Sequence, residues 1–243
     1  MRSWRLIIIG VAAWLTACAT VPPPPVAPIP SVTPIAAVIE DYRAAAARGE
    51  AVYRVDAAHS LVVMRVYRGG SLARFGHDHV IASRDVRGLV LRSDTASAQH
   101  ADVYAPLATL SVDEPALRAQ AGFDTQPTQQ DIEGTKRNML DKVLEAERFP
   151  FVSLRLKDVG GEPPALSVSA AITLHGQTAT IPLTVTLETP SAEQLYARGR
   201  FSVKQSDFGI VPLSLLGGAL RVEDRLDIEF ELAAARVTAA DLR

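Results

Sequence analysis

The histidines are the side chains in this sequence best suited to metal chemistry. Residues two apart on an extended segment point to the same face, so His77 and His79 could both reach one metal ion. His59, one expected hairpin earlier, is a candidate third ligand, and three imidazoles with an open position suit a catalytic or transport metal. The alternative is structural, with Asp78 bonding nearby backbone in a polar loop and His59 at the start of a strand. No further ligand motif strengthens the metal hypothesis.

Other patterns give little support to enzymatic chemistry. The segment Gly69-Gly70-Ser71 lacks the second glycine of a nucleophile elbow, and Asp113-Glu114 is explained by solvation at a turn. Gly217-Gly218 is too isolated for a phosphate loop. We therefore expect a binding protein and not an enzyme, with no catalytic residues and no cofactor.

The single cysteine, Cys18, is the strongest candidate for modification. It follows two arginines and an apolar run, Leu6 to Ala17, which has the length of a secretory signal and is too short to span a bilayer. The ending Leu15-Thr16-Ala17-Cys18 resembles the lipobox of a bacterial lipoprotein signal. The alternative is an ordinary signal peptide with a chance cysteine.

The lipobox resemblance implies cleavage before Cys18, a diacylglyceryl group on its sulfur and an acyl chain such as palmitate on its new amine. Several acyl chains give stable anchoring. Because residue 19 is Ala and not Asp, the sorting rule points to the outer membrane. We expect the protein on the periplasmic side of the envelope, anchored to a membrane, with the outer membrane favoured.

Composition excludes several classes of protein. The 243 residues contain 25 Lys and Arg against 27 Asp and Glu, which argues against a nucleic-acid binder. Removal of residues 1–17 would take away Arg2 and Arg5 and lower the formal net charge from −2 by two units to −4. One cysteine excludes a disulfide framework, and 48% hydrophobic residues exclude global disorder.

A proline-rich stretch separates this signal from the rest of the chain. Residues 19–34 hold seven prolines, which favours a polyproline-like spacer that reaches roughly 50 Å at about 3.1 Å per residue. Thr33-Pro34 then reads as the cap and first position of a short helix that ends near Gly49. The expected divisions are a signal at 1–17, acylated Cys18 with its tether at 18–34, a helix at 35–49 and a β domain at 50–243.

From Val52 onward the hydrophobic period changes to two, which is typical of half-buried antiparallel strands. The alternation is clearest at 167–174, 180–187 and 225–232, and His175-Gly176 predicts a tight hairpin. Pro182 indicates an edge or a bulge. Further strands are expected at 52–56, 60–67, 85–92, 101–112, 150–159 and 194–204. One inserted helix, 132–147, precedes Pro150. These elements favour an all-β barrel or sandwich.

Four motifs together resemble the YceI-like family over about residues 52–237. They are Tyr53-Arg54-Val55-Asp56-Ala57-Ala58-His59-Ser60, Arg148-Phe149-Pro150, Leu174-His175-Gly176-Gln177-Thr178 and Ser206-Asp207-Phe208-Gly209-Ile210. The resemblance implies an extended, lipocalin-like antiparallel β-barrel whose apolar interior holds a long isoprenoid or similar lipid. One departure concerns Phe75-Gly76-His77-Asp78-His79, where many members carry a glycine-and-phenylalanine pattern, so recognition of the lipid head group is expected to differ.

The candidate lining residues are apolar and point to one face of their strands, and each is also explained by ordinary core packing. They are Ile172, Leu174, Leu183, Val185, Phe201, Phe208, Ile228 and Phe230. The apolar run 211–220 is either a mobile lid for a ligand or a loop that covers one barrel end.

The leading hypothesis is therefore a membrane-tethered periplasmic barrel that sequesters a long-chain apolar lipid, with the membrane contacted through Cys18 and no nucleic-acid partner. The alternatives are a metal-dependent enzyme or carrier that uses His59, His77 and His79, and a structural envelope protein with a solid barrel. The oligomeric state and the ligand's identity stay open.

Overall fold

A computed structural model of the chain describes residues 33–93 and 95–242. The expected signal, Cys18 and the tether up to residue 32 lie outside the described residues, so the lipidation hypothesis stays a prediction. Within the described part, no helix is both long enough and apolar enough to cross a membrane.

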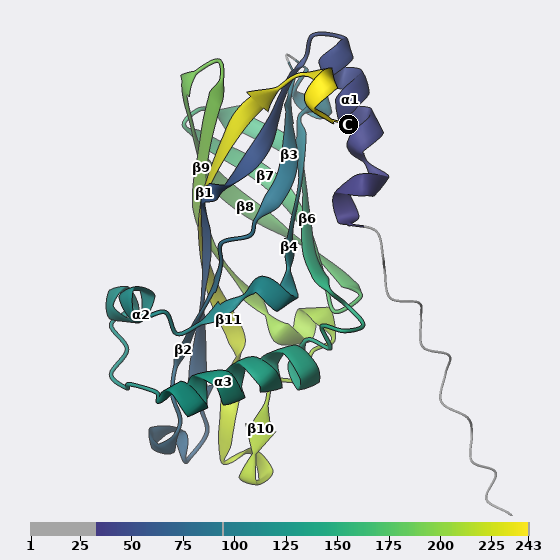
Figure 1. Ribbon diagram of the computed structural model, residues 1–243. Helices are drawn as coiled ribbons and strands as arrows, with labels where there is room; N and C mark the ends of the chain where they lie inside the picture. Colours follow the sequence, from purple (N-terminus) through teal and green to yellow (C-terminus); the bar gives the residue numbers. More distant parts are fainter. Residues whose placement is uncertain (1–32, 94, 243) are drawn as a thin grey trace, which may run out of the picture.

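The described residues form an antiparallel sheet of eleven strands, eight of which close into a barrel (Figure 1). The closed order is β11-β9-β8-β7-β6-β4-β3-β1, and β1 pairs back with β11. The eight strands are β1 Ala51–Gly69, β3 Arg87–Arg92, β4 His100–Pro106, β6 Phe151–Glu162, β7 Ala165–Leu174, β8 Gln177–Ser191, β9 Gln194–Lys204 and β11 Leu220–Val237. The all-β barrel expected from the strand pattern is confirmed.

Three short strands extend this sheet at its lower end in Figure 1: β2 His79–Ser83, β5 Ser111–Val112 and β10 Ser214–Leu215. The long strand β1 pairs with β3 near its start and with β2 near its end. The expected strand at 85–92 is confirmed as β3, whereas the strand β2, which precedes the turn into β3, was not expected from the sequence. The expected single strand at 101–112 was wrong, because the chain breaks into β4 and β5 around a short 3-10 turn, Leu107–Thr109.

The predicted hairpin at His175-Gly176 is confirmed. His175 has φ 52° and Gly176 has φ 74°, and two central residues of positive φ match the right-handed twist of the flanking strands β7 and β8. Pro182 lies where β8 pairs with β7 but no longer with β9, so its missing N–H breaks no ladder.

Three α-helices lie around the described barrel: α1 Ile39–Ala47, α2 Pro115–Ala121 and α3 Gln129–Asn138. A 3-10 turn, Pro34–Ala37, precedes α1, and a π-helical turn, Met139–Val143, continues α3. The expectation of one inserted helix missed α2, which has only seven residues and so offers little periodicity.

The helices cover the barrel at different places (Figure 1). At the upper end α1 packs on the outer wall, where the fully buried Tyr42 donates a hydrogen bond to Asp102 Oδ2 at 2.8 Å. Burial and the neighbouring Asp102 raise the pKa of Tyr42. At the lower end α3 lies across the barrel, and its Ile132 packs on the cluster that contains Ile81.

Candidate functional site

An apolar cavity of about 110 Å³ lies inside the upper half of the barrel. All eight barrel strands contribute residues to its lining, because each strand turns alternate side chains to the interior. Among the lining residues are Val55, Val168, Val185, Phe230, Leu232 and Ala234.

The outward neighbours of the lining residues are charged and paired. On β11, Glu229 accepts hydrogen bonds from Arg200 Nε at 2.9 Å and from Arg65 at 3.1 Å. Burial alone would raise the pKa of Glu229, but these arginines outweigh it and lower the pKa. The strand β11 therefore carries apolar side chains into the barrel and ion pairs to its neighbours β9 and β1 on the wall.

Polar side chains approach the cavity at one end only. Arg92, Gln99 and His100 line it where β3 connects to β4, but the His100 ring packs on Tyr42 of the helix α1, with centroids 5.0 Å apart. The Nδ1 of His100 lies 2.8 Å from the Ala98 carbonyl oxygen, and Arg92 donates to Thr189 Oγ1 at 3.2 Å. The cavity thus combines an apolar body with a polar upper rim.

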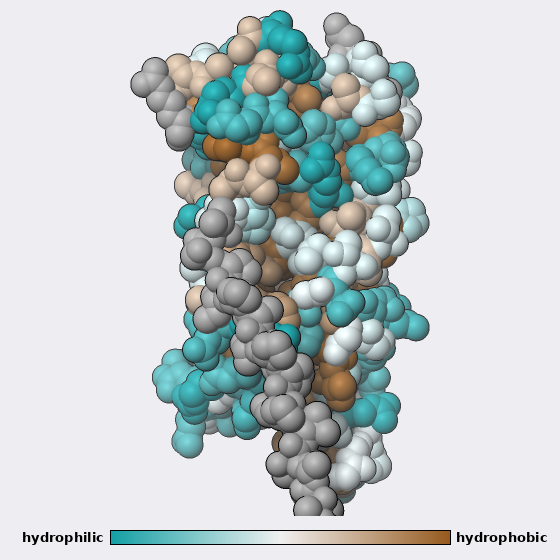
Figure 2. All heavy atoms as spheres, turned by 90° about the vertical axis from the view of Figure 1, so that its right-hand side faces the viewer, coloured by the Kyte–Doolittle hydropathy of each residue, from teal (hydrophilic) through white to brown (hydrophobic). Residues whose placement is uncertain are grey.

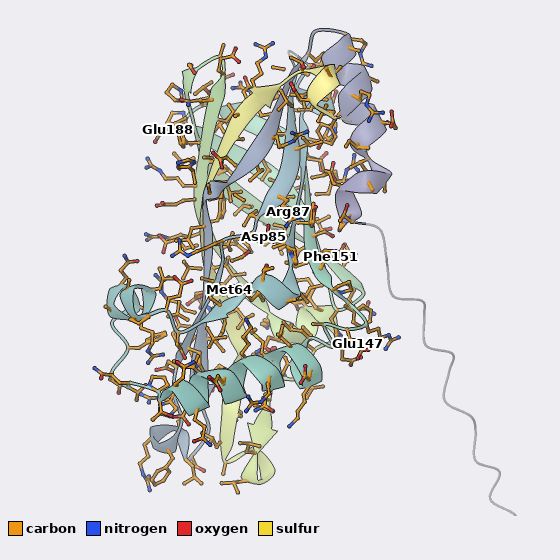
Figure 3. All side chains as sticks on the ribbon, viewed as in Figure 1. Met64, Asp85, Arg87, Glu147, Phe151 and Glu188 are labelled. Atoms are coloured by element: carbon orange, nitrogen blue, oxygen red, sulfur yellow. The ribbon has the colours of Figure 1, made fainter. Side chains whose placement is uncertain are left out.

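Below the cavity the interior is filled by side chains. The rings of Phe201 and Phe230 meet edge to face with centroids 6.4 Å apart. Farther down, Met64, labelled above α3 in Figure 3, belongs to the cluster on which Ile132 of α3 packs. Phe208 and Ile210, in and after the 3-10 turn Gln205–Phe208, are buried in a second lower cluster. The lower half of the barrel is therefore closed and packed.

The eight predicted lining residues all lie in interior clusters, but only Val185 and Phe230 line the cavity. Leu183 and Phe201 pack in the same cluster as these two. The other four occupy the packed lower half: Ile172, Leu174, Phe208 and Ile228. Sequence reasoning missed Ala101, Ala197 and Ala234, whose small side chains leave the space open. Small residues at inward positions were the available signal.

The structure does not bring the three histidines together. His59 is exposed in an irregular part of β1, with Nδ1 2.7 Å from Asp56 Oδ2. His79 pairs with Val66, which at about 3.3 Å per residue lies roughly 23 Å along β1 from His59. In the described part of the chain, no group of three or more His, Cys, Asp or Glu side chains is placed to hold a metal ion.

His79 instead belongs to a buried polar cluster around Asp113. The Asp113 carboxylate lies 2.7 Å from His79 Nδ1 and accepts hydrogen bonds from the Val80 N–H and from Arg118. Burial would raise the pKa of Asp113, but these hydrogen bonds together lower it. Asp78 accepts a hydrogen bond from the Arg68 N–H at 2.9 Å, which matches the structural interpretation of this loop.

A larger depression, about 270 Å³, lies on the outer wall beside Pro34 and Ile35. Its lining includes Asp102 and Arg155, and Asp102 is already bonded to the helix α1 through Tyr42. Figure 2 shows this side of the molecule, where hydrophilic side chains cover much of the described surface around hollows with hydrophobic ones. The mixed lining makes this depression a weaker candidate than the interior cavity for an apolar ligand.

A family model, the YceI-like domain, matches residues 53–234 of the chain. The chain belongs to the YceI-like family. The match spans the barrel from β1 to β11 and includes every strand that lines the cavity. A comparison with curated proteins found no match for this YceI-like chain.

Solved structures show the same fold. Burkholderia cenocepacia BcnA superposes with a TM-score of 0.56 at 16% identity, covering 74% of this chain and 99% of its own. A polyisoprenoid binding domain from Saccharophagus degradans, implicated in plant cell wall breakdown, superposes with a TM-score of 0.53 at 16% identity, covering 76% and 98%. These likenesses establish the YceI-like barrel fold for this chain.

Proposed function

We propose that this protein holds an isoprenoid-type or other long-chain lipid in its barrel interior while tethered to a membrane on the periplasmic side. The observation that carries the proposal is an apolar cavity whose polar lining residues, Arg92, Gln99 and His100, lie at one end. Membership of the YceI-like family supports it, as does the similar fold of a domain described as polyisoprenoid binding.

The driving force is burial of the chain, at about 0.8 kcal/mol for each CH₂ group removed from water. The cavity of about 110 Å³ is smaller than the roughly 300–1,000 Å³ of most ligand sites. It therefore takes only the end of a long chain in the closed barrel. A longer segment enters when the Phe230 and Phe201 rings at its floor move aside.

The polar rim orients the ligand. A lipid that enters tail first leaves its polar end beside Arg92 and Gln99, where hydrogen bonds replace those lost from water. No step of this function breaks or forms a covalent bond, so the protein acts as a carrier or reservoir and not as an enzyme.

The experiment that tests lipid binding is purification of the protein without detergent, followed by organic extraction and mass spectrometry of the extract. We expect a long-chain apolar lipid in near-stoichiometric amount. An extract that contains no lipid above the level of a control protein, purified from the same cells in the same way, would contradict the proposal.

The tether is tested separately through Cys18. The lipobox-like segment and the prolines of residues 19–34 support an anchored protein. We expect wild type in the membrane fraction of a bacterial host and Cys18→Ser in the soluble periplasmic fraction. Recovery of both proteins from the soluble fraction would show that Cys18 anchors nothing.

A further inference from the structure

The large apolar side chains left exposed are concentrated at one end of the molecule. In the described part of the chain they are Phe75, Tyr196, Val211, Leu215 and Leu216. All except Tyr196 lie in two loops, residues 70–78 after β1 and residues 211–219 around β10. We call these two loops the lower tip. In Figure 1 they extend below α3, at the end opposite to α1.

The two loops are locked together. The Leu72 N–H donates to the Ala219 carbonyl oxygen at 2.8 Å, and Gly70 approaches so closely that a Cβ there would lie 2.4 Å from that oxygen. Strand β10 pairs with the start of β11. The apolar side chains are thus presented by an ordered structure.

The end of the β10 hairpin carries backbone strain. Leu216 has φ 51°, and Gly217 and Gly218 follow with φ 64° and 94°. A branched side chain rarely adopts positive φ, yet Leu216 does so with 73% of its surface exposed. Packing inside the protein does not explain a strained and exposed leucine, so a contact outside the protein is the better explanation.

Within the described residues, the ion pairs at and beside the tip leave one arginine, Arg74, without a carboxylate. Arg68 binds Asp124 and Asp78, and Arg221 binds Glu223. The guanidinium of Arg74 lies 4.5 Å from the centre of the Phe75 ring, and among the described residues it has no carboxylate partner. An aromatic ring, leucines and an unpaired arginine together suit the boundary between lipid head groups and acyl chains.

We propose that the lower tip is a membrane-contact surface that inserts Phe75, Leu215 and Leu216 into a bilayer while Arg74 meets lipid phosphates. The inference rests on the tether of the proposed function. The chain from Cys18 to Thr33 can extend roughly 45 Å at about 3.1 Å per residue. Pro34 lies beside Asp102, and strand register places Asp102 level with Arg54 of β1. From Arg54 to the tip, β1 is about 50 Å long, and the tilt of the strand makes the height difference smaller. The anchor and the tip therefore reach one bilayer together.

The test measures how deep one tip residue lies in the bilayer. The full chain with Leu216→Cys carries a bimane label and is reconstituted into vesicles of phosphatidylethanolamine and phosphatidylglycerol, with or without brominated acyl chains. Tyr196→Cys, on the outer wall of β9, is the matched control, and the unsubstituted chain gives the baseline for Cys18. We expect bromine to quench about half of the Leu216→Cys emission and little of the control.

A second pair of variants tests the insertion itself. Adding Phe75→Ser and Leu215→Ser to the labelled chain should abolish the quenching while the N-terminal anchor keeps the protein on the vesicles. If the protein cosediments with vesicles but bromine quenches both labelled positions equally, or neither, the proposed insertion of the lower tip is overturned and the tether is not. If the protein does not cosediment with vesicles, both the insertion of the lower tip and the tether through Cys18 are overturned. Lipid binding in the cavity is measured separately, by the organic extract.

Discussion

Ala234 on β11 offers the sharpest test of the cavity, because it lines the cavity and its neighbour Ala235 is exposed on the outer wall. Ala234→Leu adds the equivalent of three CH₂ groups inside the barrel, worth about 2.4 kcal/mol of burial at ~0.8 kcal/mol each. This is close to the roughly 2.6 kcal/mol by which an empty cavity of about 110 Å³ lowers the free energy of unfolding, at roughly 24 cal/mol per Å³. Overpacking strain of about 1–3 kcal/mol offsets part of the gain.

We therefore expect Ala234→Leu to raise the free energy of unfolding of the lipid-free protein by about 1 kcal/mol. The same substitution should lower the lipid recovered from detergent-free protein about tenfold, because the filled cavity no longer admits an apolar chain. Denaturant titration measures the first quantity and mass spectrometry of the extract the second. Ala235→Leu, which points away from the cavity, should leave the recovered lipid unchanged.

The reasoning would be refuted by an Ala234→Leu protein that folds and retains lipid at the wild-type level. Such a result would place the lipid outside the cavity. A loss of lipid in Ala235→Leu as large as in Ala234→Leu would point to the same conclusion, since only one of the two side chains faces the interior.

Three further substitutions test the supporting structure, each by denaturant titration. Asp113→Asn should lower the free energy of unfolding by about 3–5 kcal/mol, because it leaves a buried arginine without its anion. The pKa of Asp113 is lowered from 3.8, so its contribution to the free energy of unfolding is present above pH 3.8 and is lost as the pH falls further. An Asp113→Asn variant whose stability falls with acid as steeply as that of wild type would argue against this. Gly122→Ala should lower the free energy of unfolding by about 1–2 kcal/mol, because an alanine there must adopt positive φ. Gly176→Ala should lower it further, because its Cβ would also lie 2.7 Å from Phe149. Equal losses in the two variants would contradict this prediction. Tyr42→Phe should lower the free energy of unfolding by about 1.5–3 kcal/mol, because it removes the hydrogen bond to the Asp102 carboxylate. An unchanged free energy would show that α1 docks without this bond.

The barrel could be predicted from the sequence because alternation is a local signal. The stretches 167–174, 180–187 and 225–232 each fall within one strand, and His175-Gly176 supplies the residue types that a tight hairpin requires. The start of the first helical segment was equally local, since a 3-10 turn begins at Pro34, although Thr33 makes no side-chain cap bond and the α-helix itself starts at Ile39. These features depend on neighbours in the chain.

The site was harder to predict because it depends on the summed volumes of side chains from many strands. Phe201 and Ala197 both face inward on β9, but only the alanine lines the cavity. The spacing of His77 and His79 likewise could not reveal that Asp113, from a distant segment, bonds one ring, or that His59 lies far along β1. Register and packing, which decide these contacts, are not local properties.

The most direct test of the central claim is the native mass of the full chain purified without detergent. We expect a species heavier than the covalent mass of the chain by one long-chain apolar lipid for each chain, and loss of that extra mass in Ala234→Leu. A single species at the covalent mass of the chain, in wild type as well as in Ala234→Leu, would contradict the account.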